Sequence, residues 1–177
     1  GNRLVEHPDV AKVAFTGSTE VGRRIAAGAA NTIKRVTLEL GGKSANVIFA
    51  DADLERAAAA APAAVFGNAG QDCCARSRIL VEESAVDRFL ELLESAVKSI
   101  AVGDPLDEGT EMGPLISAGQ LDTVSSYLHD DVSVAFRGGA PDGPGYWFAP
   151  TVLYPVDAGD RAVREEIFGP IAAVVPF

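Results

Sequence analysis

The stretch KVAFTGSTEVGRRIAAGAANTIKRVTLEL, residues 12–40, decides the expected fold of this chain. Residues 12–16 are typical of a short buried strand. A helix is expected to open at residues 17–20, where a serine or threonine of the first turn can accept a free backbone N–H. Residues 35–40 alternate between apolar and polar, which indicates a second strand. A strand, a helix and a strand within about 30 residues have the size of a βαβ unit.

Strands and helices are expected to alternate along the rest of the chain as well, which predicts an α/β fold with a largely parallel sheet. Ser84 is expected to cap a long amphipathic helix. Pro150 is expected to place the end of its strand at a sheet edge. Further strands are predicted at residues 46–49, 78–81, 132–136, 148–153 and 171–177, and helices from residue 51 through the alanine run with a kink at Pro62, and at 84–100, 120–128 and 163–167.

The composition is that of a soluble globular protein, with 47% hydrophobic and 23% charged residues. A formal net charge of −10 argues against a nucleic-acid binder, which would carry a basic patch. The start lacks the apolar run of a signal peptide, and the apolar stretch 57–66 is too short to span a bilayer. Two cysteines form no disulfide framework, so a cytoplasmic setting is expected. The chain starts without methionine and ends inside an apolar run, and we expect it to be a piece of a longer protein.

The only two cysteines, Cys73 and Cys74, stand side by side in NAGQDCCARSR, residues 68–78. A zinc site is disfavoured, because there is no C-x-x-C pair and His7 and His129 are isolated. A redox dithiol would also prefer C-x-x-C spacing. Two interpretations stay open at this point. The cysteines are buried apolar side chains, or one of them is a nucleophile on a positioned loop.

A carboxylate is the candidate base. Glu39 lies in TLELGGKSANVIF, residues 37–49, at the expected C-terminal end of a strand. Catalytic groups in open α/β sheets tend to lie outside the carboxyl ends of the strands. The alternative is a glutamate at the sheet edge that points into water.

These motifs together resemble the NAD(P)-dependent aldehyde dehydrogenases. The order of the glutamate motif and the cysteine motif carries most of the resemblance. It implies an aldehyde-dehydrogenase-like α/β fold, with residues 1–41 as the C-terminal part of a dinucleotide-binding domain of parallel sheet and residues 42–177 as most of a catalytic domain. The matching stretches are VAFTGSTEVG, LELGGKSANVIF, GQDCCARSR, GDPLDEGTEMGPLIS, GYWFAPTVL and EEIFGP.

The resemblance implies roles for individual residues. Cys73 would be the nucleophile and Glu39 the general base, with Cys74 a bystander. No metal is implied. The residues implied to bind the cofactor, NAD or NADP, are Gly17, Ser18, Val21 and Gly22 at the helix opening, Glu166 at a ribose and Phe168 beside the nicotinamide.

The resemblance also implies the reaction. The Cys73 thiolate, with its pKa lowered by the site, would attack an aldehyde, and the Cys73 backbone N–H is one candidate donor to the oxyanion. Loss of hydride leaves a thioester, which water activated by Glu39 hydrolyses. Gly41 and Gly42 would let Glu39 move.

Asp72 raises a question of substrate. An acid at this position would attract a cationic aldehyde such as an aminoaldehyde, but it would also raise the pKa of the thiol. The alternative is that Asp72 points into solvent or pairs with Arg76 or Arg78.

The expected partners are an aldehyde substrate and further copies of the chain in a homo-oligomer, without nucleic acid or membrane. Two other interpretations stay open. One is a non-catalytic relative or fragment that binds a nucleotide or partner. The other is a cysteine enzyme that hydrolyses thioesters or esters, which needs Cys73 and Glu39 but not Ser18, Glu166 or Phe168.

Overall fold

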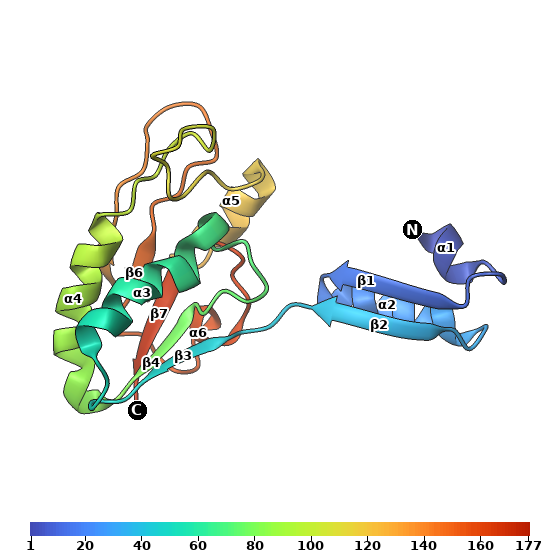
Figure 1. Ribbon diagram of the computed structural model, residues 1–177, viewed down its shortest axis with the longest axis horizontal. Helices are drawn as coiled ribbons and strands as arrows, with labels where there is room; N and C mark the ends of the chain where they lie inside the picture. Colours follow the sequence, from blue (N-terminus) through green and yellow to red (C-terminus); the bar gives the residue numbers. More distant parts are fainter. The chain divides into compact units, whose positions relative to one another are not determined.

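The computed structural model describes residues 1–177, and the chain divides into two compact units, Gly1–Gly42 and Lys43–Phe177 (Figure 1). Each unit has a sheet of its own. We describe each unit by itself.

The first unit is the expected βαβ unit with one additional short helix at its start. Strands β1 and β2 pair in parallel, with Thr16 opposite Glu39. The side chain of Ser18 caps the intervening helix, because its Oγ accepts the Val21 N–H at 3.3 Å. The elements are α1 (Asn2–Glu6), β1 (Lys12–Gly17), α2 (Thr19–Ala30) and β2 (Arg35–Leu40), of which α1 was not predicted.

The second unit is built on a five-stranded sheet with the strand order β3-β4-β7-β6-β5. All neighbouring strands are parallel except β5 and β6, so the expectation of a largely parallel sheet is confirmed with one antiparallel edge strand. The elements are β3 (Ala45–Ile48), α3 (Leu54–Phe66), η1 (Gly67–Gly70), β4 (Arg78–Val81), η2 (Glu83–Ala85), α4 (Val86–Lys98), α5 (Ala118–Ser125), β5 (Val134–Arg137), β6 (Thr151–Leu153), α6 (Arg161–Arg164) and β7 (Ile171–Pro176).

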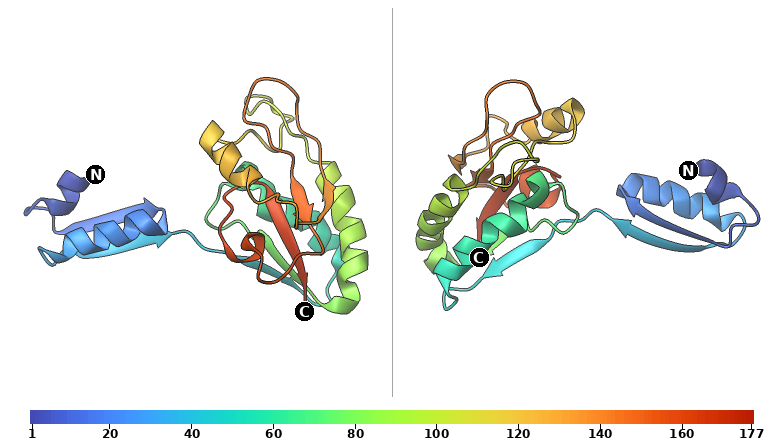
Figure 2. Two further views of the ribbon diagram at one scale, coloured as in Figure 1. Left: turned by 180° about the vertical axis from the view of Figure 1, so that it is seen from behind. Right: turned by 45° about the horizontal axis from the view of Figure 1, so that its top comes forward.

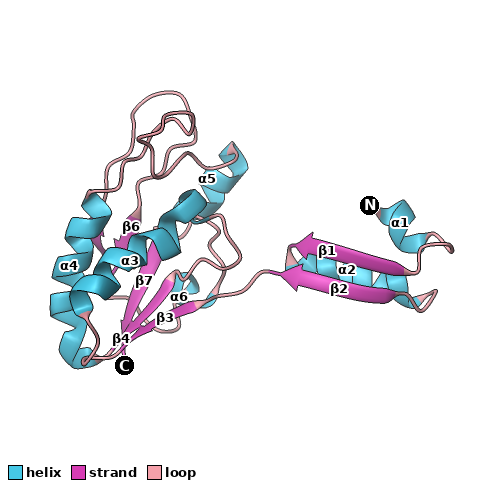
Figure 3. Ribbon diagram, viewed as in Figure 1, coloured by secondary structure: helices cyan, strands magenta, loops and turns pink.

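Helices α3 and α4 pack against each other and cover one face of this sheet, and α6 lies on the other face (Figures 2 and 3). The apolar stripe of α4 enters the core, where Phe89 and Leu93 are fully buried. Residues 171–174 of the central strand β7 are buried as well, as is typical of a strand covered on both faces. None of the helices is long and apolar enough to cross a membrane.

Two local expectations are wrong. Ser84 does not cap the long helix, because it lies inside η2, where the Ala85 N–H donates to the Glu82 carbonyl at 2.8 Å. Pro150 does not mark a sheet edge. It precedes β6, which lies between β7 and β5, and the first ladder N–H comes from Thr151.

Two helices begin earlier than expected because side chains cap them. Ser117 Oγ accepts the Gln120 N–H at 3.2 Å and starts α5 at Ala118. Asp160 Oδ1 accepts the Ala162 N–H at 2.7 Å and starts α6. Helix α3 runs through the alanine stretch with Pro62 inside it, as expected, and the kink at Pro62 stays a prediction.

Candidate active site

The loop between η1 and β4 presents both cysteines to solvent. Their Sγ atoms lie 3.9 Å apart. This exposure overturns the interpretation that the cysteines are buried apolar side chains. The backbone N–H of Cys73 has no acceptor among the hydrogen bonds of the chain, so it is free to donate to an oxyanion.

The backbone before the cysteines is held in an unusual conformation. Asn68, Ala69 and Gly70 have φ angles of 51°, 54° and 68°, in the left-handed region that non-glycine residues rarely adopt. Such a conformation persists only where neighbouring contacts enforce it. The side chains of Asn68 and Gln71 supply part of that enforcement, since Asn68 Nδ2 donates to the Gln71 carbonyl at 3.0 Å.

The cysteine loop is also fixed from outside. Gln71 Oε1 accepts the Ile116 N–H at 2.9 Å, which links the loop to the segment that leads into α5. Gly70 lies directly against the backbone of Gly169 and Pro170. The cysteine loop and the segment around Phe168 are therefore neighbours within the second unit.

The charges around Cys73 do not activate its thiol. The pKa of the Cys73 thiol is raised, first by its hydrogen bond with Cys74 and the charge of Cys74, and further by partial desolvation and the nearby Asp72. The expected lowering of the pKa is thus wrong for this chain taken alone, whereas the expected effect of Asp72 is confirmed. Asp72 forms no salt bridge with Arg76 or Arg78. Its Oδ1 instead accepts the Cys74 N–H at 2.9 Å.

The segment that carries Glu166 and Phe168 follows α6. Phe168 has a φ angle of 55° and is 40% exposed. Its carbonyl accepts a hydrogen bond from Gln120 Nε2 of α5 at 2.8 Å. Glu166 is exposed, and Gly169 packs against Val124 of α5. An exposed aromatic ring and a carboxylate are thereby displayed next to the cysteine loop.

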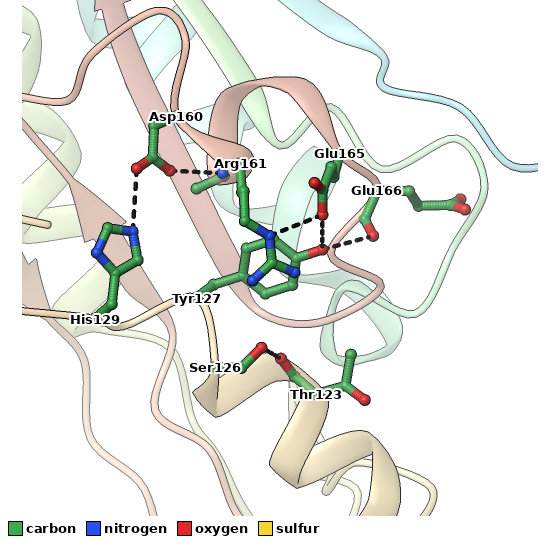
Figure 4. A network of polar contacts seen from close by, with 9 residues as sticks. Thr123, Ser126, Tyr127, His129, Asp160, Arg161, Glu165 and Glu166 are labelled. Carbon is green, nitrogen blue, oxygen red and sulfur yellow. Dashed lines mark hydrogen bonds and ion pairs between the residues drawn. The ribbon is translucent and has the colours of Figure 1, made fainter.

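A polar network that sequence reasoning missed holds this segment in place (Figure 4). Tyr127 Oη donates to Glu165 Oε2 at 3.1 Å, and Arg161 Nε donates to the same oxygen at 3.1 Å. The Arg161 guanidinium lies over the Tyr127 ring, 4.6 Å from its centroid. Burial, and then the Glu165 carboxylate, raises the pKa of Tyr127. His129 Nε2 contacts Asp160 Oδ2 at 3.1 Å beside it.

Lys43 is a second feature that the sequence did not reveal. Its Nζ atom is buried without a hydrogen-bond partner in the chain. Desolvation, and then the Arg78 charge, lowers the pKa of Lys43 to about 8, although the charges of Glu166 and Glu165 act to raise it. The Arg78 guanidinium donates to the Lys43 carbonyl at 2.9 Å. The residue stands in the glutamate motif, but no spacing in that motif indicates burial.

In the first unit, the residues expected to meet a dinucleotide gather where β1 passes into α2. Gly17 ends the strand, Ser18 caps the helix and Val21 is 39% exposed. Gly22 is buried, and a Cβ atom there would lie 2.6 Å from Leu40 Cδ2, so Gly22 allows α2 to pack closely on β2. A helix N-terminus directly after a parallel strand suits a pyrophosphate, so these residues fit a dinucleotide cofactor.

Glu39 is exposed at the end of β2, as expected. It belongs to the first unit and Cys73 to the second, so their meeting in one cleft stays a prediction. Asp72, Cys73 and Cys74 offer three ligand atoms within 4.8 Å of one another, which is one fewer than a structural zinc site needs. The expectation of no metal also stays a prediction.

An exposed loop thiol beside a free backbone N–H can form a covalent adduct with a carbonyl compound. The comparison with known families specifies the class further. The sequence model of the aldehyde dehydrogenase family matches residues 1–177, and the chain belongs to this family.

The curated relatives of the chain are named as aldehyde dehydrogenases. A betaine aldehyde dehydrogenase of Rhizobium johnstonii is 43% identical over an alignment of 184 residues, which covers 100% of this chain and 38% of the relative. The mitochondrial aldehyde dehydrogenase of Mesocricetus auratus is 44% identical and is covered to 36%. The chain therefore spans little more than a third of the length of these curated relatives.

Solved structures confirm the fold. A betaine aldehyde dehydrogenase of Staphylococcus aureus in complex with NAD+ has a TM-score of 0.93 at 40% identity, over 100% of this chain and 37% of that one. An aldehyde dehydrogenase of Pseudomonas syringae, a mutant in complex with NAD+ and octanal, has a TM-score of 0.94 at 34% identity, over 100% and 38%. The expected aldehyde-dehydrogenase-like α/β fold is thereby confirmed.

Proposed function

We propose that the protein containing residues 1–177 oxidises aldehydes to carboxylic acids with NAD+ or NADP+, through a covalent intermediate on Cys73. The observation that carries this proposal is the exposed Cys73 thiol, next to its own free N–H, on a loop fixed by Gln71 and Gly70. Family membership supports it, as do the complexes of related enzymes with NAD+.

Cys73 performs the covalent step. Its thiolate attacks the aldehyde carbon, a C–S bond forms, and the carbonyl oxygen takes the electron pair, which the Cys73 N–H stabilises. The bound nicotinamide cofactor supplies an acceptor for the hydride of this adduct, and a thioester then remains on Cys73. Because Cys74 and Asp72 raise the pKa of the thiol, forming the thiolate requires a base that accepts its proton.

Glu39 is the base in this proposal. A carboxylate at the carboxyl end of a parallel strand is placed where open α/β sheets present catalytic groups. It takes a proton from the water that hydrolyses the thioester. The glycines at positions 41 and 42 separate Glu39 from Lys43, the first residue of the second unit, and give this junction backbone freedom.

Each unit contributes residues to cofactor binding in this proposal. Gly17, Ser18, Val21 and Gly22 form the turn and helix start that meet the pyrophosphate, and the α2 dipole favours its negative charge. Glu166 accepts hydrogen bonds from a ribose and Phe168 packs beside the nicotinamide. Residues 1–41 are then the end of the dinucleotide-binding domain and residues 42–177 most of the catalytic domain.

Asp72 makes a cationic aldehyde the preferred substrate class. Its carboxylate is exposed beside the nucleophile and forms no salt bridge with a basic side chain of the chain. A negative charge there attracts cationic substrates, and several relatives are named for betaine aldehyde, whose quaternary ammonium is a cation. We expect a cytoplasmic homo-oligomer that binds neither nucleic acid nor membrane.

The substitution Glu39→Gln tests the assignment. If Glu39 activates the hydrolytic water, the variant accumulates an acyl group on Cys73 when the whole protein is given aldehyde and NAD+ or NADP+, and mass spectrometry of the Cys73 peptide detects it. A variant that turns over like the wild type without an acyl adduct would remove Glu39 from the mechanism.

A further inference from the structure

The two thiols of the loop form a chelating pair. Cys73 and Cys74 are both exposed, their Sγ atoms are 3.9 Å apart, and no other cysteine occurs in the chain. Two sulfur atoms at this separation can both bond to a single atom placed between them. The proposed oxidation of aldehydes uses only Cys73 and leaves Cys74 without a role.

The pair is held in place before any ligand arrives. Asp72 Oδ1 accepts the Cys74 N–H at 2.9 Å, and the Asp72 carbonyl accepts the Ala75 N–H at 3.1 Å, which closes a tight turn around the two cysteines. Once one sulfur has bonded to a ligand, the second bond forms within the same molecule. Such an intramolecular second bond raises the apparent affinity by about a hundredfold or more.

The geometry selects the ligand class. A divalent metal ion would find two sulfurs and one Asp72 carboxylate oxygen, which lie within 4.8 Å of one another, and Asp72 Oδ1 already accepts the Cys74 N–H. Structural zinc is bound by four protein ligands. A trivalent arsenic compound that carries one organic substituent needs only two sulfurs. We propose that Cys73 and Cys74 are a vicinal dithiol site that binds one organic arsenic(III) centre through both sulfur atoms.

The bonding step balances without an oxidant. With an arsine oxide as ligand, two As–S bonds form and the arsenic–oxygen double bond breaks. The two thiol protons leave with that oxygen as one water molecule, and arsenic remains trivalent. Because the oxygen carries the protons away, the reaction accepts neutral thiols, and the raised pKa of Cys73 is compatible with it.

Phenylarsine oxide is the probe, and intact mass spectrometry of the whole protein is the measurement. The wild type is expected to gain one phenylarsenic group, which survives excess mercaptoethanol and is released by dimercaptopropanol. Cys73→Ser and Cys74→Ser are each expected to lower the apparent affinity by about a hundredfold or more, because a single thiol forms only one bond. Labelling with a maleimide, followed by mass spectrometry of the peptide that carries positions 73 and 74, counts the accessible thiols of the pair, two in the wild type and one in each variant.

Two results would overturn the proposal. One is a wild type that gains no phenylarsenic group although both thiols label with the maleimide. The other is a single-cysteine variant that binds as tightly as the wild type. Because the mass is measured without aldehyde or nicotinamide cofactor, a failure here is distinguishable from a failure of the dehydrogenase proposal.

Discussion

Gly70 lies so close to Gly169 that a side-chain carbon on Gly70 would overlap the Gly169 carbonyl. This contact joins the loop of Cys73 to the segment of Phe168, which are about a hundred residues apart in the chain. The Gly169 backbone cannot easily move away from Gly70, because Gly169 itself packs against Val124 of α5. The two segments that the proposed reaction needs can thus lie side by side because neither Gly70 nor Gly169 carries a side chain.

The first prediction concerns this contact. Gly70→Ala is expected to lower the free energy of unfolding by about 2 to 4 kcal/mol, because it combines overpacking against backbone with a left-handed φ angle. Gly67→Ala is the matched control, since a Cβ atom on Gly67 meets nothing within 4 Å. Denaturant unfolding measures both. Equal stability of the two variants would contradict the close approach.

The second prediction concerns the network around Glu165. Tyr127→Phe removes the hydroxyl that donates to Glu165 and is expected to cost about 1 kcal/mol of stability. It is also expected to raise the KM for the nicotinamide cofactor more than it lowers kcat, because Glu166 follows Glu165 directly and Phe168 lies two residues further on. Tyr154→Phe is the control, since its hydroxyl has no partner in the chain. A change in kcat alone would argue against a positioning role.

The third prediction concerns the reactivity of Cys73. Since the hydrogen bond and charge of Cys74, and then Asp72, raise the pKa of the Cys73 thiol, removing either neighbour should lower it. Cys74→Ser and Asp72→Asn are expected to shift the pH midpoint of Cys73 alkylation downward, with Cys74→Ser giving the larger shift. Peptide mass spectrometry after treatment with iodoacetamide at a series of pH values gives this midpoint. An upward shift in either variant would be inconsistent with these contacts.

The fourth prediction concerns Lys43, whose pKa is lowered from 10.5 to about 8 in the folded chain. Between these two values the unfolded chain binds more protons, so this residue makes the free energy of unfolding rise as the pH increases from about 8 to 10.5. Below that window the buried ammonium carries its full cost.

The substitution Lys43→Met should remove this rise and stabilise the chain at neutral pH, by up to about 3 kcal/mol from the size of the shift. The exposed Lys98 serves as the control through Lys98→Met. Denaturant unfolding of the chain at neutral pH and near pH 10.5 supplies the comparison. The account of Lys43 fails if its substitution leaves the pH dependence unchanged.

The sequence predicted the alternation of strands and helices because apolar periodicity is a local signal, and β1, α2, β2 and β4 appear within a residue of where it placed them. Helices α5 and α6 start earlier than predicted, because the capping side chains Ser117 and Asp160 precede the apolar residues of each helix.

In the candidate site, too, local features could be predicted from the sequence and long-range contacts could not. Motifs singled out Cys73, Glu39, Ser18 and Phe168 as candidates, since each stands in a short stretch that resembles a family motif. Contacts between residues far apart in the chain left no such signal. The Tyr127–Glu165 hydrogen bond, the packing of Gly70 on Gly169 and the burial of Lys43 all depend on how distant segments meet.

The central claim is that Cys73 is the nucleophile of an aldehyde oxidation. The most direct test is the formation of NADH or NADPH by the whole protein with neutral and cationic aldehydes, in the wild type, Cys73→Ser and Cys74→Ser. We predict turnover in the wild type and in Cys74→Ser, and a loss of about a thousandfold or more in Cys73→Ser. Turnover that survives in Cys73→Ser, or no turnover by a wild type that binds the cofactor, would contradict the claim.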